Sequence, residues 1–150
     1  MVYGLKNPYI WVMNTILAFL RQLEANNNKS WFDAHKGEYL EARAHFNAIV
    51  EKLIDGIAGF DPSVRGVGIK ESTYRIYKDM RFSKDGLPYK THFGAFICRG
   101  GRKSGYSGYY FHIGTGSGGD YPCRSFLAVG NYFMEPKVLK ILREDIELGG

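Results

Sequence analysis

The chain changes character at about residue 66, from helical periodicity to β-favouring runs broken by glycines. Before this point, apolar residues recur every three or four positions, first over 16–23 and then over 40–57, which predicts two amphipathic helices. After it, fourteen of the 23 aromatic residues lie within 74–133, and ten of the 19 glycines lie within 94–130. Aromatic runs separated by glycine turns are typical of strands. Helices are therefore expected first and a sheet second.

Four strands and a closing helix are expected in the second half. The segments between the strands are short and contain turn residues such as Asp85-Gly86, and short connections favour antiparallel neighbours. Glu135-Pro136 favours the start of a last helix, because proline is tolerated in a first turn. We predict one α+β domain over residues 1–150, with N-terminal helices, a central antiparallel β-sheet and a closing C-terminal helix. The expected strands lie near 72–80, 92–99, 107–114 and 124–133.

Length and composition agree with one globular domain. A chain of 150 residues with a hydrophobic fraction of 45% can form a core without metal or disulfide. No apolar run reaches the roughly 18 residues of a membrane span, and the N-terminus lacks the layout of a signal peptide. We therefore expect a cytoplasmic protein with no membrane partner. Cys98 and Cys123 are too few for a disulfide framework and are expected to be reduced.

The positive charge of the chain is concentrated in one segment. The formal net charge is +5, yet residues 70–103 hold nine Lys or Arg and only three Asp or Glu, a net of +6. Such a segment creates a local positive potential that attracts phosphates, carboxylates or nucleic acid. An anionic partner is therefore the first candidate.

Polar and apolar residues alternate within this segment. In an extended chain Arg75, Tyr77, Asp79 and Arg81 would share one face, and the apolar side chains between them would share the other. An aspartate between two arginines can bind one of them bidentately and leave the other for an anionic ligand. The same pattern also fits an ion network that only ties the sheet to a loop.

This stretch resembles the pattern Arg-x-x-(Arg/Lys)-Asp-x-Arg-Phe-x-x-Asp-x-x-x-Tyr, which marks domain-of-unknown-function family 2461, a mainly bacterial family. The matching positions are Arg75, Lys78, Asp79, Arg81, Phe82, Asp85 and Tyr89. Further similar stretches extend the resemblance over roughly residues 15–147. Members of the family are usually longer, so the resemblance implies that this chain ends before a C-terminal portion. It implies no activity, cofactor or partner.

Histidines supply candidates for proton transfer. His92 and His112 lie in neighbouring predicted strands, and an unperturbed histidine titrates near neutral pH. If the protein is an enzyme, we expect His112 or Asp79 to be the catalytic residue. No His-x-His, Cys-x-x-Cys or Glu-x-x-His spacing occurs, so no metal is expected. The glycine run 114–119 does not open a helix, so no dinucleotide cofactor is expected either.

Together these observations predict a basic, tyrosine-bearing pocket for a small anionic ligand with phosphate or carboxylate groups. The residues expected to bind it are Arg75, Tyr77, Lys78, Arg81, Tyr89 and Lys90. The first alternative is an enzyme of phosphoryl or acyl chemistry that uses the same cluster. The others are single-stranded nucleic-acid binding, a less favoured partner, and a purely structural ion network.

Overall fold

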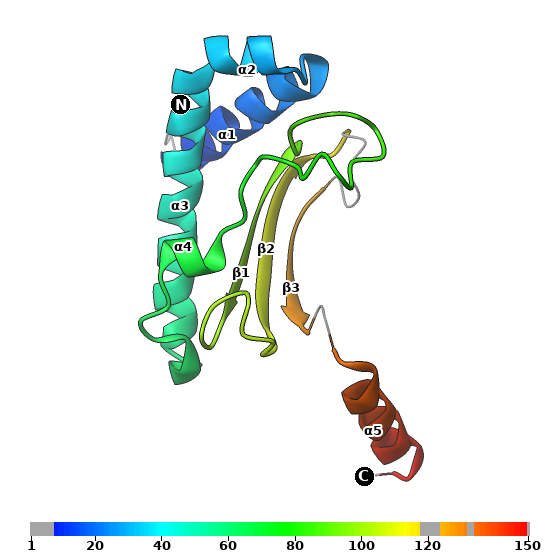
Figure 1. Ribbon diagram of the computed structural model, residues 1–150. Helices are drawn as coiled ribbons and strands as arrows, with labels where there is room; N and C mark the ends of the chain where they lie inside the picture. The colour runs from blue at the N-terminus through cyan, green and yellow to red at the C-terminus, as the bar shows by residue number, and fades with distance from the viewer. Residues whose placement is uncertain (1–7, 118–123, 132–133, 150) are drawn as a thin grey trace, which may run out of the picture.

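The computed structural model describes residues 8–117, 124–131 and 134–149 (Figure 1). The N-terminal half is helical and consists of α1 (Pro8–Ala25), α2 (Lys29–Ala34), α3 (Lys36–Ala58), the 3-10 turn η1 (Pro62–Val64) and α4 (Ile69–Ser72). An antiparallel sheet of β1 (His92–Cys98), β2 (Gly108–Thr115) and β3 (Arg124–Gly130) follows, and α5 (Pro136–Glu147) comes last. The predicted α+β class, with helices before and after an antiparallel sheet, is confirmed.

The core lies between the helices and one face of the sheet. Side chains of a strand point alternately to its two faces, so Phe93, Ala95 and Ile97 of β1 face the helices, and Ile113 of β2 joins them. The helical stripes predicted from the sequence supply the other side of this core. Their buried members include Ile16, Leu20, Leu23, Phe46 and Val50, and Phe19 and Ala42 join them, whereas Leu40 at the start of the second stripe is 56% exposed.

The expected strand at 72–80 is not formed, and the sheet has three strands instead of about four. This segment makes only two isolated bridges, Thr73 with Ala95 and Tyr77 with Tyr89. The chain then turns, because the Phe82 N–H donates to the Asp79 carbonyl at 3.0 Å. The Tyr74 N–H still donates to the Gly94 carbonyl at 3.0 Å, but the Tyr74 carbonyl accepts a hydrogen bond from a helix side chain, as described below. The alternation of faces therefore ends before residue 80.

The C-terminal elements are the most exposed part of the described structure. Helix α5 has no buried residue and lies apart from the sheet in Figure 1. Six of the seven residues of β3 are exposed, Leu127 and Val129 among them. The glycine run and Cys123 fall partly or wholly at 118–123, outside the described residues. Within the described residues, no helix combines the length and apolar character that a membrane span requires.

Candidate functional site

The loop formed by residues 79–87, called the 79–87 loop below, is held by one ion pair within itself and by a second one to Lys78. Arg81 binds Asp79 bidentately, with Nε 3.0 Å from Oδ1 and Nη2 2.7 Å from Oδ2. Hydrogen bonds from the side chain and the backbone of Arg81 hold the pKa of Asp79 below its ordinary value. Asp79 therefore engages an arginine as the sequence suggested, and its partner is Arg81 rather than Arg75. Both groups lie on an exposed turn.

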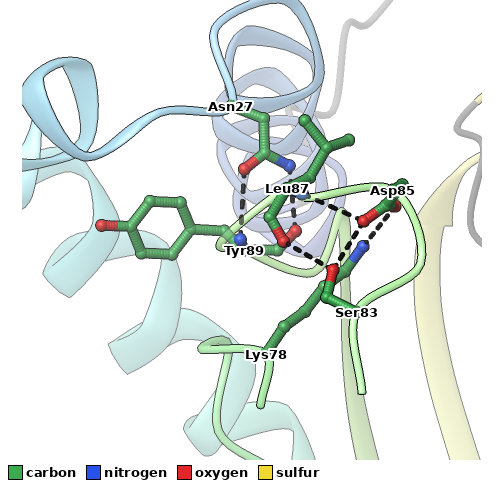
Figure 2. Close-up of polar contacts among 6 residues, drawn as sticks. All are labelled: Asn27, Lys78, Ser83, Asp85, Leu87 and Tyr89. Carbon is green, nitrogen blue, oxygen red and sulfur yellow. Dashed lines mark hydrogen bonds and ion pairs between the residues drawn. The ribbon is translucent and has the colours of Figure 1, made fainter. Parts of the chain in front are cut away.

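Asp85 organises the rest of this loop (Figure 2). Its carboxylate accepts from Lys78 Nζ at 2.8 Å, from the Ser83 hydroxyl at 2.8 Å and from the Leu87 N–H at 3.0 Å. These donors stabilise the ionised form, so the pKa of Asp85 is lowered. Lys78 is thus engaged in bracing the loop, and only 15% of its side chain is exposed.

Tyr77 and Tyr89 face the helices. The Tyr89 ring stacks on Phe32 of α2 with centroids 4.0 Å apart, and the Tyr77 ring meets Phe32 edge-on at 5.7 Å. The Tyr77 hydroxyl accepts from Lys36 Nζ at 3.3 Å. The Asn27 carboxamide is hydrogen-bonded to the Tyr89 backbone, which fixes the end of the 79–87 loop to the α1–α2 connection (Figure 2).

His112 lies on the sheet face opposite the helices and is fully buried. Its Nδ1 is 2.9 Å from the Tyr110 hydroxyl. Its ring stacks on His92, with centroids 4.4 Å apart, and on Phe126 at 5.0 Å. The two histidines therefore do share a sheet face, as adjacent strands in antiparallel register allow, but His112 has no direct access to solvent.

A cleft of about 520 Å³ opens beside this face, and we call it the cationic cleft. It lies between the segment that follows α4, the loop of the β1–β2 hairpin and the end of β3. Its lining residues are Tyr74, Arg75, Lys90, Phe96, Arg102, Lys103, Gly105, Tyr106 and Asn131. Four of them are cationic, and none of the lining residues that the structure describes is acidic.

The four cations of the cleft are held differently. Arg102 is fixed by its backbone N–H, which donates to the Glu71 carbonyl at 2.9 Å, and by Nη1, which donates to the Lys70 carbonyl. Lys90 Nζ and the Arg102 guanidinium each lie 5.6 Å from the centroid of the Tyr74 ring. Arg75 and Lys103 are exposed and form no hydrogen bond or ion pair with any described residue. The cleft thus combines side chains that are held in place with side chains that are exposed.

Arg43 of α3 positions the wall of the cleft, and sequence reasoning missed it. Its Nη1 donates to the Tyr74 carbonyl and its Nη2 to the Thr73 hydroxyl, both at 2.8 Å. Partial burial lowers the pKa of Arg43, and the nearby Arg102 lowers it further. No local pattern singles out this arginine, because its partners are about thirty residues away in the sequence.

The structure brings together only some of the residues predicted to bind a ligand. Arg75 and Lys90 line the cationic cleft. The other four predicted ligand residues lie outside it, and so does Asp79. They are Tyr77, Lys78, Arg81 and Tyr89. In their place the β1–β2 hairpin loop contributes Arg102, Lys103 and Tyr106. The two cations belong to the basic segment 70–103, whereas Tyr106 lies outside it.

The fold and the cleft define an α+β domain with a concentrated cationic surface. The family described as conserved hypothetical protein DUF2461 matches residues 15–150. The chain therefore belongs to this family, and the predicted resemblance is confirmed. No curated protein and no solved structure matches the chain. In the described parts of the chain, no three His, Cys, Asp or Glu side chains gather as metal ligands would.

Proposed function

We propose that this protein binds a small anionic ligand, carrying phosphate or carboxylate groups, in the cationic cleft. The observation that carries the proposal is the lining itself, with four cationic and no acidic side chains among the described residues. Like charges gathered around one cavity repel each other, and an anion placed between them relieves this repulsion. A cytoplasmic location, expected from the sequence, forms part of the same proposal.

Arg102 supports this proposal as the fixed anion contact. A guanidinium has five N–H donors in a planar fork that matches phosphate and carboxylate geometry. The bond to the Lys70 carbonyl takes one of these donors and orients the group. Because the backbone of Arg102 is also tied to Glu71, little further ordering is required when a ligand binds.

Arg75 and Lys103 support it as exposed contacts. Neither forms a hydrogen bond or ion pair with a described residue, so ligand binding would break no such bond, although Arg75 also interacts electrostatically with Asp79. A charge-assisted hydrogen bond contributes about 1.5–3 kcal/mol, which corresponds to at least about tenfold in affinity.

The test is isothermal titration calorimetry at low salt with inorganic pyrophosphate and with citrate. We expect binding of at least one probe by the wild type and a loss of about tenfold in Arg75→Ala and in Lys103→Ala. Lys84→Ala is the matched control, because Lys84 belongs to the same basic segment and is exposed outside the cleft. Absence of binding by the wild type contradicts the proposal. An equal loss in Lys84→Ala does so as well, since it would indicate only long-range attraction.

A second candidate function is proton-transfer catalysis by Tyr110 and His112, which lie next to the cationic cleft but outside its lining. Tyr110 pairs across the strands with Phe96, which lines the cleft, and its hydroxyl is 2.9 Å from His112 Nδ1. In this proposal the phenol of Tyr110 relays a proton between His112 and a bound phosphoryl or acyl group. Asp79 keeps the role of orienting Arg81.

Turnover of p-nitrophenyl phosphate and p-nitrophenyl acetate tests the catalytic candidate. We expect activity in the wild type that falls with Tyr110→Phe and His112→Gln while pyrophosphate affinity is retained. Wild-type protein that binds pyrophosphate and turns over neither ester leaves binding as the function and contradicts this second candidate.

A further inference from the structure

The cationic cleft contains more than positive charge. Phe96, which is 8% exposed, contributes an apolar surface to the lining, and the rings of Tyr74 and Tyr106 contribute aromatic walls. A cavity of about 520 Å³ lies in the size range of sites for small organic molecules. An inorganic anion would occupy a small part of this space and leave the aromatic surface in water. The lining therefore favours a ligand with both an anionic and an apolar part.

The two tyrosines differ in how their rings are used. The Tyr74 ring is contacted by both Lys90 and Arg102, so its π-electrons already hold cations in place. The Tyr106 ring has Arg99 over it at 5.3 Å, yet Tyr106 is still 51% exposed. An exposed ring backed by a guanidinium is the arrangement on which nucleobases stack. Tyr106 is thus available as a stacking platform at the cleft.

The remaining cations of the basic segment argue for one compact ligand rather than a strand. Lys78 is paired with Asp85, and Arg81 is paired with Asp79. Those pairs lie at the 79–87 loop, outside the cleft lining. A protein that tracks a nucleic-acid strand needs a groove of available cations along several phosphates. Here the exposed cations Arg75 and Lys103, which lack such a partner, line a single cavity, whereas the exposed Lys70 and Lys84 lie outside its lining.

We infer that the ligand of the cationic cleft is an aromatic phosphate of the mononucleotide type. Its phosphate would bind between Arg75, Arg102 and Lys103, and its ring would stack on Tyr106. This inference rests on the proposed anion binding and adds the ring subsite to it.

A series of probes on the wild-type protein separates the ring subsite from the proposed anion binding. The probes are the four nucleoside monophosphates AMP, GMP, CMP and UMP, ribose 5-phosphate, adenosine, inorganic pyrophosphate and an octathymidylate strand. We expect the best monophosphate to bind at least about tenfold more tightly than ribose 5-phosphate, which has no base to stack. Equal affinities for the monophosphates and ribose 5-phosphate would overturn the ring subsite and leave anion binding standing. No binding of any phosphate, pyrophosphate included, would overturn the proposed function itself.

The strand probe distinguishes a free nucleotide from a nucleic acid. If octathymidylate binds more tightly than every monophosphate, with affinity that falls steeply with salt, the ligand is a strand and the inference is overturned. Tyr106→Leu should remove the preference for the monophosphate over ribose 5-phosphate, and Tyr106→Phe should keep it, because the aromatic ring is retained. A preference that survives in a folded Tyr106→Leu variant would overturn the placement of the ring. The series of probes on the wild-type protein decides the ligand class even if a variant is unstable.

Discussion

The Asn27 side chain is hydrogen-bonded to both backbone polar groups of Tyr89. Its Nδ2 donates to the Tyr89 carbonyl at 2.9 Å, and its Oδ1 accepts from the Tyr89 N–H at 3.1 Å. The carboxamide thus replaces the strand partner that a backbone in this position would otherwise need. This one residue connects the first two helices to the end of the 79–87 loop, across 62 residues of sequence.

We predict that Asn27→Ala destabilises the protein by about 1–3 kcal/mol, because it leaves a half-buried N–H and C=O without partners. Urea denaturation measures the change. Asn26→Ala is the control, since the Asn26 amide donates only to Gln22 on the exposed surface of its own helix. It should change stability by no more than about 0.5 kcal/mol. Equal effects of the two substitutions would show that the hydrogen bonds between Asn27 and Tyr89 contribute nothing specific to stability.

Arg43→Lys is predicted to destabilise the protein by about 2 kcal/mol. An ammonium group cannot reach the Tyr74 carbonyl and the Thr73 hydroxyl with the fork geometry that the guanidinium uses. Because Tyr74 lines the cleft, pyrophosphate binding should weaken as well. Arg21→Lys, at an exposed arginine of α1, provides the comparison and should be close to neutral. Denaturation curves of Arg43→Lys that overlay those of the wild type would contradict this role.

The 79–87 loop should loosen in acid. The folded-state pKa of Asp85 is lowered by its hydrogen bonds from Lys78, Leu87 and Ser83, so its ionised form is the stabilising one. The contribution is therefore complete above the unfolded pKa of about 4 and is lost as the pH falls through the lower folded value. An NMR titration should show the Asp85 carboxyl and the Leu87 amide changing together, below pH 4. If the Asp85 carboxyl titrated at its ordinary pKa, the role of Asp85 in holding the 79–87 loop would be contradicted.

Asp85→Asn is the matched variant for this titration. It removes the charge and keeps the shape of the side chain, so the Leu87 amide should exchange faster with solvent and lose its acid transition. Retention of the transition in Asp85→Asn would assign it to another group.

Gly101→Ala is predicted to destabilise the β1–β2 hairpin loop, and Gly105→Ala is its control. Both glycines have positive φ, +85° and +81°, which costs an alanine about 1–2 kcal/mol. A Cβ at Gly101 would also lie 2.8 Å from Glu71 Cβ, whereas a Cβ at Gly105 meets nothing within 4 Å. Overpacking adds about 1–3 kcal/mol, so Gly101→Ala should be clearly the less stable by thermal denaturation. Equal melting temperatures would contradict the close approach of this loop to Glu71.

Local patterns in the sequence predicted most of the fold. The helical stripe through Phe46 and Val50 and the β-hairpin around Gly100-Gly101 depend on neighbours a few residues away, so periodicity and turn residues reveal them. The prediction of a strand at 72–80 was wrong, because the structure of this segment depends on residues that are distant in the sequence. Its alternation is real only as far as Tyr77, and a contact from the distant Arg43 takes the carbonyl that a ladder would have used.

The sequence by itself determined the fold class, the family pattern and the concentration of positive charge in residues 70–103, because each of these is a property of neighbouring residues. Only the tertiary structure decided where each of those charges lies. Packing pairs Lys78 with Asp85 and Arg81 with Asp79, whereas it gathers Arg75, Lys90, Arg102 and Lys103 around one cleft. This arrangement depends on the antiparallel pairing of the strands and on the long-range hydrogen bonds of Arg43. These contacts set distances between segments that are far apart in the sequence.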